Sequence, residues 1–469
     1  MNPPAALLPL GYTVELNRTV TVRDDGRSLV GGSPTRAIYL APAAAARFDG
    51  RRLTVADKTS GTLADRLLEI GMADPVLASL PEADATDVTF VIPTYGRPES
   101  LARLLSSIGR DASVIVVDDA SPNPLEASQI AAAAGARFVS LPVNLGPAGA
   151  RNAGLRLVAT TFVVFVDNDM VVSPGAVDML LRHFSDPRVA LAAPRIVGLA
   201  MNTRVNWISR YEDARSSLDL GPWPATVRPR ARISWISSAL VVARVSAIGA
   251  GFTDGMRVGE DVDLVWNLVE EGWRVRYEPD ATSAHEHRVT FADWAARKAF
   301  YGTGGHALAL RHPGNIAPAV LAPWSVGVVL ALMAQRRWSI PLALVISAVA
   351  AVRIARKLSR HRHPVRIGVA LTASGVGASI SQAMALLTRH WWPLALAGSV
   401  VSKRMRRATL AAALLDVVLD YRRTRPQLDI IRFGVARRAD DLAYGWGLWL
   451  GALRGRSTAA LRPDIRSHR

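Results

Sequence analysis

The sequence contains no cysteine, and its last third has few acidic residues. Without cysteine there can be no disulfide, no thiolate metal site and no cysteine nucleophile, which suits a reducing compartment. Residues 331–469 hold 24 Lys and Arg but only 6 Asp and Glu, whereas residues 1–330 hold 32 and 33. The net charge of +17 therefore comes from the C-terminal third.

The location of this charge bears on the partner of the protein. A nucleic-acid enzyme is expected to carry positive charge around its active site. Here the charge accompanies long apolar runs, which suits an anionic membrane surface at about 1 kcal/mol per well-placed cation. A basic but soluble helical domain is the alternative. We expect a membrane-surface partner and no nucleic acid.

Three uncharged runs mark the C-terminal region. Residues 312–335 are long enough to cross a bilayer, residues 338–352 are short for a span, and residues 367–388 are diluted by Ser, Thr, Gly and Gln. Arginine clusters follow both of the first two runs, against the positive-inside tendency of two full spans. The pattern favours re-entrant or surface-lying helices, with a single spanning pair as the alternative.

The first 85 residues predict a small α+β module. Residues 12–22 alternate like strands, and residues 27–32 predict a turn and a return strand. Residues 60–71 predict a helix with Ser60 as its N-cap. Short strands followed by a helix indicate a winged-helix-like module, which a linker at 81–87 separates from the next domain.

Residues 87–300 repeat an apolar strand, a turn and a helix. The predicted strands lie at residues 88–92, 114–117, 137–141 and 161–166. Continuous Val, Ile and Phe runs between helices indicate a buried, mostly parallel sheet of the Rossmann-like α/β class. In such sheets ligands bind outside the carboxyl ends of the strands, and acidic pairs follow two of these strands.

The strongest single motif is Asp167-Asn168-Asp169, directly after the fourth strand. Two carboxylates on a strand-end turn can hold Mg²⁺ or Mn²⁺ through oxygen ligands, and such an ion would neutralise a departing diphosphate. An ordinary surface turn is the alternative, because Asp and Asn are common turn residues. The position at the end of a buried strand favours the metal site.

Other candidates each have an ordinary structural explanation. Asp119 ends the second strand and could accept hydrogen bonds from a base or ribose, or could simply close a turn. Arg151 lies in a Gly-rich approach to a helix and could pair with a phosphate. Glu260 and Asp261 open a helix, where the helix dipole alone favours acids. His285 is equally suited to a structural role and to a ligand role.

Taken together, these motifs resemble the family-2 inverting glycosyltransferases, which have a GT-A fold. The resemblance is carried by residues 91–98, 117–121, 144–152, 167–169 and 259–261, in the order and spacing of that family. The sequence has no P-loop, which argues against an NTPase, and no HExxH zinc motif.

The resemblance implies a role for each matching position. A UDP-sugar donor would be bound by eight residues: Pro93, Thr94, Tyr95, Arg97, Asp119, Arg151, Asp167 and Asn168. A Mg²⁺ or Mn²⁺ ion would be bound by Asp167, Asp169 and His285. Asp261 would be the catalytic base, with Glu260 beside it, in one displacement that inverts the anomeric carbon.

Within the family, the layout is similar to that of the glycosyltransferases of mycofactocin biosynthesis. Residues 9–12 and 62–67 are similar to the PqqD-like peptide-binding modules of peptide-derived cofactor pathways. This similarity implies UDP-glucose as donor and a peptide-derived redox cofactor as acceptor, extended by β-1,4-glucose units. The Gln-x-x-Arg-Trp element of polysaccharide synthases is not matched, because residues 335–338 have the wrong spacing.

The predicted organisation has three parts. Residues 1–85 form the PqqD-like peptide-binding module, residues 87–300 the GT-A domain, and residues 301–469 a basic, apolar, helical region associated with the cell membrane. The catalytic domain is expected on the cytoplasmic side. Two further hypotheses are a glycosyltransferase acting on polyprenyl phosphate or a cell-envelope glycan, and a non-catalytic peptide-binding membrane scaffold.

Overall fold

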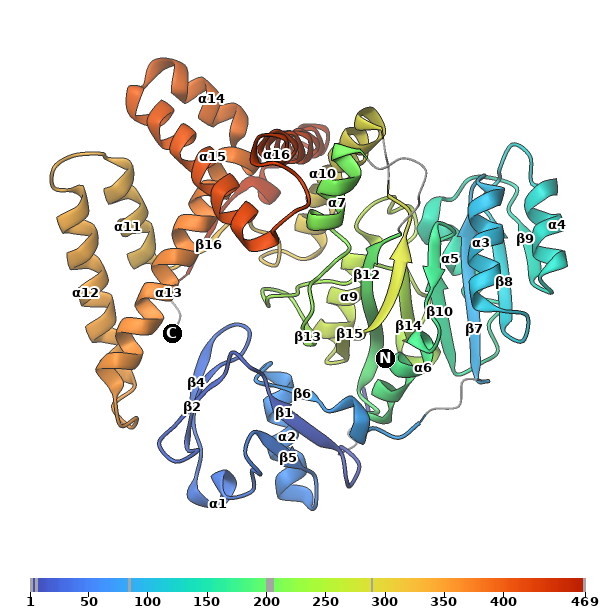
Figure 1. Cartoon of the computed structure of the whole chain (residues 1–469), viewed down its shortest axis with the longest axis horizontal. Helices are drawn as coiled ribbons and strands as arrows, with labels where there is room; N and C mark the ends of the chain where they lie inside the picture. Colours follow the sequence, from blue (N-terminus) through green and yellow to red (C-terminus); the bar gives the residue numbers. More distant parts are fainter. Residues whose placement is uncertain (1–2, 5–6, 83–85, 200–205, 288–289, 467–469) are drawn as a thin grey trace. The chain divides into compact units, whose positions relative to one another are not determined.

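The computed structural model describes residues 3–4, 7–82, 86–199, 206–287 and 290–466 (Figure 1). These residues form two compact units. Unit 1 comprises Met1–Met201 and Ser216–His287, and unit 2 comprises Asn202–Arg215 and Arg288–Arg469. Positions 83–85 of the predicted linker lie outside the described residues.

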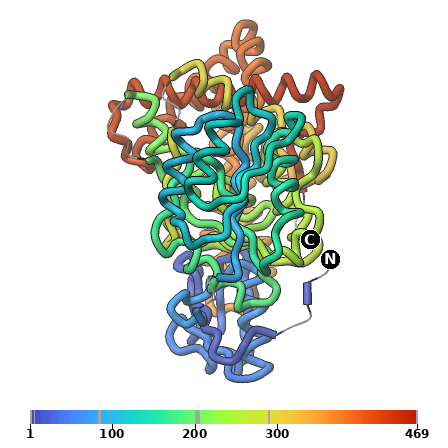
Figure 2. The backbone as a smooth tube through the Cα atoms, turned by 90° about the vertical axis from the view of Figure 1, so that its right-hand side faces the viewer, coloured from blue at the N-terminus to red at the C-terminus, as the bar shows by residue number. Residues whose placement is uncertain are grey.

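The N-terminal part of unit 1 is an α+β module with its own core, seen in Figure 2 as a blue lobe. Two antiparallel three-stranded sheets are ordered β5-β1-β6 and β2-β3-β4. The elements are β1 (Thr13–Leu16), β2 (Thr21–Arg23), β3 (Ser28–Gly31), β4 (Arg36–Tyr39), α1 (Pro42–Ala45), β5 (Arg52–Thr54), α2 (Lys58–Glu69), β6 (Ala73–Pro75) and the 3₁₀ turn η1 (Leu77–Ser79). Its likeness to a winged helix stays a prediction.

Helix α2 begins two residues earlier than predicted, and the N-cap assigned to Ser60 was wrong. The cap is Asp57, whose carboxylate accepts a hydrogen bond from the Ser60 N–H at 2.8 Å, while the Ser60 hydroxyl accepts one from the Asp57 N–H at 2.9 Å. This reciprocal capping box satisfies two backbone donors. The sequence misled because Asp and Ser are equally good caps.

Ion pairs connect this module to the large sheet of unit 1. Asp65 on α2 pairs with Arg274 and, at 3.1 Å, with Arg188, and Arg274 also pairs with the buried Asp186 at 2.7 Å. The Arg228 guanidinium donates to the Ser33 carbonyl at 2.6 Å. Buried charges of this kind are stable only when they are paired, so the contacts fix how the module meets the sheet.

The large sheet has the order β11-β15-β12-β14-β10-β7-β8-β9, with β13 paired to β15. Its strands are β7 (Val88–Thr94), β8 (Ser113–Asp118), β9 (Arg137–Ser140), β10 (Phe162–Val166), β11 (Met170–Val172), β12 (Val189–Gly198), β13 (Ala225–Val227), β14 (Leu240–Arg244) and β15 (Arg274–His285). Strands β10, β7, β8 and β9 are parallel, as predicted. Strand β14 runs antiparallel to both β10 and β12, so the other half of the sheet is mixed.

Helices cover both faces of the sheet. Helices α3 (Pro98–Ile108), α4 (Leu125–Ala133) and α6 (Ala176–Arg182) pack on one face, and α5 (Gly146–Leu155) packs on the other. The remaining helical elements of unit 1 are η2 (His183–Ser185), α8 (Val245–Ile248) and α9 (Glu260–Glu270). A Cβ at Gly154 would lie 2.4 Å from a Val91 methyl group, so only glycine lets α5 lie this close to β7.

Unit 2 is helical apart from one short pair of strands. It contains α7 (Trp207–Arg215), α10 (Phe291–Arg311), β16 (Val320–Leu321), α11 (Pro323–Met333), α12 (Ser339–Lys357), α13 (Pro364–Ala385), the π-helical turn η3 (Leu386–His390), α14 (Trp392–Val401), α15 (Lys403–Thr424), α16 (Ile430–Arg454), η4 (Ala459–Leu461) and β17 (Asp464–Ile465). Strands β16 and β17 pair in parallel.

The prediction that residues 312–335 form one segment long enough to cross a bilayer was wrong. Helix α10 ends at Arg311, and only Pro323–Met333 is helical within the run. Pro313, Pro318 and Pro323 explain the break, because proline cannot donate a helical hydrogen bond. By length and composition, the helices able to cross a membrane are Ser339–Lys357 and Pro364–His390.

The close contact of α5 with β7 leads to a stability prediction. Gly154→Ala is expected to lower the free energy of unfolding of unit 1 by about 1 kcal/mol. The added methyl group must displace the fully buried Val91, an overpacking cost of about 1–3 kcal/mol that outweighs the roughly 1 kcal/mol gain in helix propensity. Urea denaturation followed by tryptophan fluorescence measures the change.

Gly61→Ala is the matched control, because its Cβ would meet only a Val55 methyl group at an ordinary 3.5 Å. This variant should be as stable as the wild-type protein or slightly more stable. Equal stability of the two variants would show that β7 shifts at no cost.

Candidate active site

The candidate site lies where three adjacent strands end. Strands β10, β7 and β8 are neighbours and parallel, so their carboxyl ends meet at one edge of the sheet. Strand β7 was predicted to end at Ile92 but continues to Thr94, which pairs with Asp118 on β8. The motifs that follow these strands are therefore brought together, as parallel sheets require.

The Arg151 side chain connects two of the acidic motifs. Arg151 is 2% exposed, and its guanidinium donates to Asp167 Oδ1 at 2.6 Å and to Glu260 Oε1 at 3.0 Å. Burial acts to lower the pKa of Arg151, but the charges of Asp167 and Glu260 outweigh burial and raise it. Arg151 is therefore a permanent cation that joins the turn after β10 to the start of α9.

The carboxylates of the turn after β10 point to different partners. Asp167 faces Arg151, and burial raises the Asp167 pKa against the opposing charge of that arginine. Asp169 pairs with Arg97 at 3.0 Å and lies 3.5 Å from His285 Nε2. His285 comes close because β11 and β15 pair with Met170 opposite His285.

The predicted metal ligands are partly assembled. Asp169 and His285 are adjacent, whereas Asp167 is bound to Arg151. Within the described ranges, no group of three or more His, Asp or Glu side chains could hold a metal ion. Mg²⁺ is commonly bound by one or two carboxylates together with substrate phosphates. The residues therefore fit an ion that takes its remaining ligands from a bound diphosphate and from water.

The predicted donor-binding residues on the β7 side form a second group. The Asn168 side chain donates to the Thr94 hydroxyl at 2.9 Å and so ties the turn after β10 to the end of β7. Pro93 is half-buried, Tyr95 is exposed, and Arg97 is held at a φ of 56° as the N-cap of α3. Arg97 and Tyr95 thus lie on the open side of this edge.

Asp119 has a structural task in addition to any contact with a ligand. Its two carboxylate oxygens accept hydrogen bonds from the N–H groups of Leu145 and Gly146, at 2.7 and 2.9 Å. These contacts hold the first turn of α5, the helix that carries Arg151. The predicted contact of Asp119 with a base or ribose stays a prediction.

Asp261 lies in the first turn of α9, which begins after Gly259 at a φ of 81°. Its carboxylate accepts a hydrogen bond from the Val262 N–H at 2.8 Å and forms no ion pair in the described part of the chain. Burial, and to a smaller extent the neighbouring Glu260 charge, raise the pKa of Asp261 to about 7, while Arg151 acts in the opposite direction. A carboxylate with this pKa is suited to accepting a proton near neutral pH.

Sequence reasoning missed the residues that support α9. Asn152 accepts from the Phe252 N–H at 2.8 Å and donates to the Phe252 carbonyl and to Asp254, which fixes the loop before α9. The fully buried Asp263 accepts from the Thr253 hydroxyl at 2.6 Å. Asn152 belongs to the motif at residues 144–152, so the sequence could have marked it as a functional residue. Its partners could not be predicted, because they lie about 100 positions away.

Comparison with known proteins identifies the family. The model of the family described as Glycosyl transferase family 2 matches residues 89–232, and that of Glycosyl transferase family group 2 matches residues 162–402. The pre-mycofactocin glycosyltransferase of Mycobacterium tuberculosis (strain ATCC 25618 / H37Rv) is 42% identical over 481 residues, which cover 99% of this chain and 100% of that protein. The chain belongs to glycosyltransferase family 2. The large mixed sheet of unit 1 is thus its GT-A-like domain.

More distant relatives match parts of the chain. The poly-beta-1,6-N-acetyl-D-glucosamine synthase of Staphylococcus aureus (strain N315) is 24% identical over 234 residues, which cover 48% of this chain and 56% of that protein. Among solved structures, the mannosyltransferase PcManGT of Pyrobaculum calidifontis in complex with GDP-Man and Mn²⁺ has a TM-score of 0.37 and 18% identity, and covers 65% of this chain and 91% of that one.

The position of Arg151 leads to a prediction for this glycosyltransferase. Arg151→Met is expected to lower the free energy of unfolding by about 3 kcal/mol, because removing one partner of a buried ion pair leaves uncompensated carboxylates. The double variant Arg151→Met/Glu260→Gln should recover part of that loss, since one of the two charges is gone. Urea denaturation of the single and double variants measures both changes.

Arg156→Met at the exposed end of the same helix is the control and should have little effect. If the double variant were no more stable than Arg151→Met, the coupling between Arg151 and Glu260 would be absent.

Proposed function

We propose that this family-2 glycosyltransferase transfers glucose from UDP-glucose to a mycofactocin precursor, with inversion, and extends it as a short β-1,4-glucan. The assignment of the acceptor rests on the 42% identity to the pre-mycofactocin glycosyltransferase over practically the full length of both chains. The α+β module of residues 1–85 supports the proposal, because a peptide-derived acceptor needs a peptide-binding surface beside the catalytic domain.

The proton transfer is assigned to Asp261. The acceptor hydroxyl attacks poorly while it keeps its proton, and a positioned base contributes about 10²–10⁴-fold to the rate. The pKa of about 7 makes Asp261 basic enough to take that proton and still ionised in a large fraction of molecules at neutral pH. A single in-line displacement by the activated hydroxyl inverts the anomeric carbon.

We assign donor binding to the side of Arg151 that is opposite to Asp261. Asp169 and His285, with Asp167 nearby, would hold Mg²⁺ or Mn²⁺. When bound, this ion offsets the negative charge that develops on the departing UDP. Arg97 can turn from Asp169 to the diphosphate, because its side chain is about half exposed, at 46%. Pro93, Thr94, Tyr95, Asp119 and Asn168 form the wall for the nucleotide.

Glu260 is assigned a positioning role beside the base. Its carboxylate is bound to Arg151, so it holds the first turn of α9 against the turn after β10. We place the helical region of residues 301–469 at the cytoplasmic face of the cell membrane, as its two long apolar helices support.

A second candidate function differs only in its acceptor. The partial match to a polysaccharide synthase and the exposed apolar helices of unit 2 favour polyprenyl phosphate or a cell-envelope glycan. A non-catalytic peptide-binding scaffold is disfavoured, because it would not need Asp261 placed with a raised pKa beside the Arg151 cluster.

The acceptor can be identified by a transfer assay with labelled UDP-glucose. The full-length protein is incubated with the mycofactocin precursor in one reaction and with a lipid extract in another. We expect hexose-extended products in the aqueous phase of the first reaction, detected by mass spectrometry. Label found only in the organic phase would assign a lipid acceptor instead. Binding of the precursor without UDP-glucose, with no product in either reaction, would favour the scaffold.

The base assignment predicts a separation of catalysis from binding. Asp261→Asn is expected to lower kcat by about 10²–10⁴-fold, because the amide cannot accept the proton of the acceptor. The affinity for UDP-glucose with Mn²⁺, measured by calorimetry, should change by less than about threefold, because the donor contacts of the proposal lie elsewhere. Asp111→Asn, at an exposed position in the loop before β8, is the matched control.

The same assignment sets a pH profile. Since burial raises the pKa of Asp261 to about 7, kcat/KM of the wild-type enzyme should fall about tenfold per pH unit below that value as the base becomes protonated. The residual activity of Asp261→Asn should lack this fall. An identical acid limb in both enzymes would assign the base to another residue.

A further inference from the structure

Helix α16 carries its charged side chains on the inside. Arg437, Asp440 and Asp441 are buried, and the exposed charges of the helix, Arg432 and Arg454, stand at its two ends. Over the roughly 33 Å between these ends, at 1.5 Å per residue, large apolar side chains are exposed instead. This polarity is the reverse of that of a surface helix in water.

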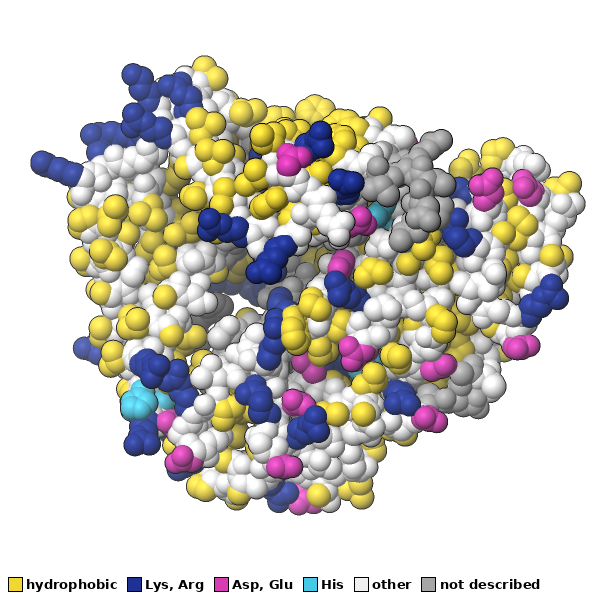
Figure 3. Space-filling model, viewed as in Figure 1, with side chains coloured by type: hydrophobic (Ala, Val, Ile, Leu, Met, Phe, Trp, Pro, Cys, Tyr) yellow, Lys and Arg dark blue, Asp and Glu magenta, His cyan; other side chains and the backbone are white. Residues whose placement is uncertain are grey.

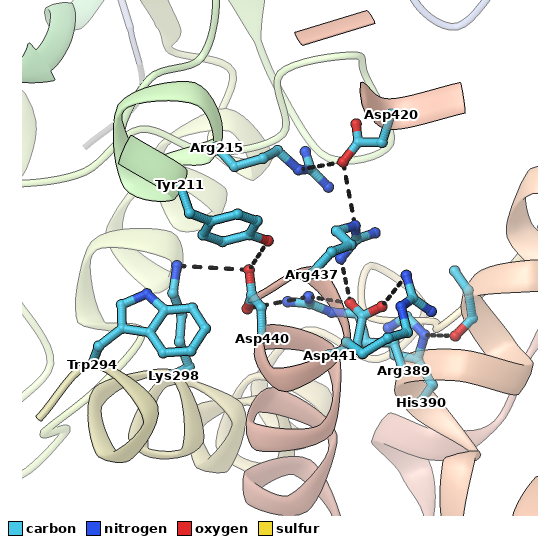
Figure 4. Close-up of polar contacts among 12 residues, drawn as sticks. Tyr211, Arg215, Trp294, Lys298, Arg389, His390, Asp420, Arg437, Asp440 and Asp441 are labelled. Atoms are coloured by element: carbon cyan, nitrogen blue, oxygen red, sulfur yellow. Dashed lines mark hydrogen bonds and ion pairs between the residues drawn. The ribbon is translucent and has the colours of Figure 1, made fainter. Parts of the chain in front are cut away.

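The inward charges neutralise one another (Figure 4). Asp441 pairs with Arg437 and, at 3.0 Å, with Arg389 of η3, and Arg437 also pairs with Asp420 of α15 at 3.3 Å. Asp440 accepts a hydrogen bond from the Tyr211 hydroxyl at 3.0 Å. Charged side chains in membrane-embedded bundles show the same arrangement, facing the interior and pairing with one another.

Helix α15 repeats the pattern. Asp416 and Asp420 point inward to the arginines of α16, while leucines line the exposed side. We call the large exposed apolar side chains of both helices the outer face; its members are Leu410, Leu414, Leu415, Leu419, Ile430, Ile431, Val435, Leu442, Trp446 and Leu453. Figure 3 shows hydrophobic side chains gathered over these helices and over α11 to α13.

The packing under the outer face is typical of helices in lipid. Helices α10 and α16 meet through glycines on both sides: a Cβ at Gly302 would lie 2.1 Å from the Tyr444 carbonyl oxygen, and one at Gly447 still closer to that of Ala299. Gly447 and Gly451 are four residues apart. Close approach through small residues is how helices associate when apolar burial gives no driving force.

A basic cluster begins where the apolar surface of α14 ends. Lys403, Arg404, Arg406 and Arg407 are exposed at the start of α15, immediately after the exposed Val400 and Val401. No acidic residue occurs from 391 to 415. Such a cluster beside an apolar surface complements anionic lipid headgroups. In Figure 3, Lys and Arg side chains gather over the turn between α14 and α15.

We propose that the outer face contacts the acyl chains of a bilayer and that the basic cluster at residues 403–407 binds its anionic phospholipid headgroups. An apolar surface of this extent is rare on a soluble monomer, and a second copy of the chain would not account for the basic cluster. A hydropathy profile does not identify α15 and α16 as helices in contact with lipid. Their charged residues lower the mean hydropathy even though these charges are paired inside the bundle. The proposal rests on the membrane location given in the proposed function and specifies which surface contacts the lipid. Its test needs neither donor nor acceptor.

Flotation with vesicles tests the proposal on the full-length protein. Wild-type protein should float with phosphatidylcholine vesicles that contain phosphatidylglycerol. The variant Leu414→Gln/Leu415→Gln/Trp446→Gln should partition at least tenfold less, and Arg406→Gln/Arg407→Gln should lose mainly the preference for the anionic lipid. Leu125→Gln, an equally exposed leucine on α4 of unit 1, should float like the wild type. Unchanged flotation of the triple variant would overturn the proposal and assign membrane contact to α12 and α13.

The absence of cysteine allows a second measurement that does not depend on the stability of the triple variant. Single cysteines introduced as Leu414→Cys, Trp446→Cys and Leu125→Cys can each be labelled with the fluorophore NBD. Vesicles should shift NBD emission to the blue at positions 414 and 446, with quenching by brominated acyl chains, and leave position 125 unchanged. Iodide quenching from water at 414 and 446, or a blue shift without vesicles in a dimeric fraction, would contradict lipid contact.

UDP-glucose binding by the triple variant separates this proposal from the proposed function. The variant should bind the donor like the wild-type protein, because the substituted side chains all lie in unit 2. Loss of flotation with intact donor binding supports the outer face alone, whereas absent donor binding in the wild-type protein would count against the proposed function and not against lipid contact.

Discussion

The ion pairs of Arg151 are the interaction on which the geometry of the site depends. The side chain links the turn after β10 to the first turn of α9, which lie far apart in the sequence. A buried cation loses its hydration, so such a pair contributes little net stability compared with an apolar contact. Its effect is positional: without the guanidinium, Asp167 and Glu260 would repel each other, and the donor side of the site would separate from the base side.

Several small features serve this one contact. Gly154 lets α5 approach β7, the Asp119 carboxylate holds the first turn of α5, and Asn152 fixes the loop that leads into α9. Because Arg151 takes up Glu260, the neighbouring Asp261 is left without a cation of its own. Burial, and then the adjacent Glu260 charge, raise the Asp261 pKa to about 7 and make this carboxylate a proton acceptor.

The sequence predicted those parts of the fold that depend on local pattern. The parallel strands β7 to β10 were visible as apolar runs, and the acidic motifs after them fall at one edge of the sheet, as parallel topology requires. The reversed direction of β14 was not visible, because an apolar run has the same composition in either direction. Nor could the partners of Arg151 be found, since they lie 16 and 109 positions away. Prolines that break the run at 312–335 were present but outweighed by its hydropathy.

The same physical rule acts in both units with opposite results. A buried charge must be paired, and in unit 1 Arg151 has two carboxylates to satisfy it, which leaves one acid over for chemistry. In unit 2 the charges around Arg437 pair among α15, α16 and η3, which leaves the outside of these helices to leucine, valine and tryptophan. Counting charges along a helix therefore says little about its surroundings until the direction of each charge is known. The direction of each charge is set by the folded bundle, which is why an exposed apolar face of unit 2 can lie on two of its most charged helices.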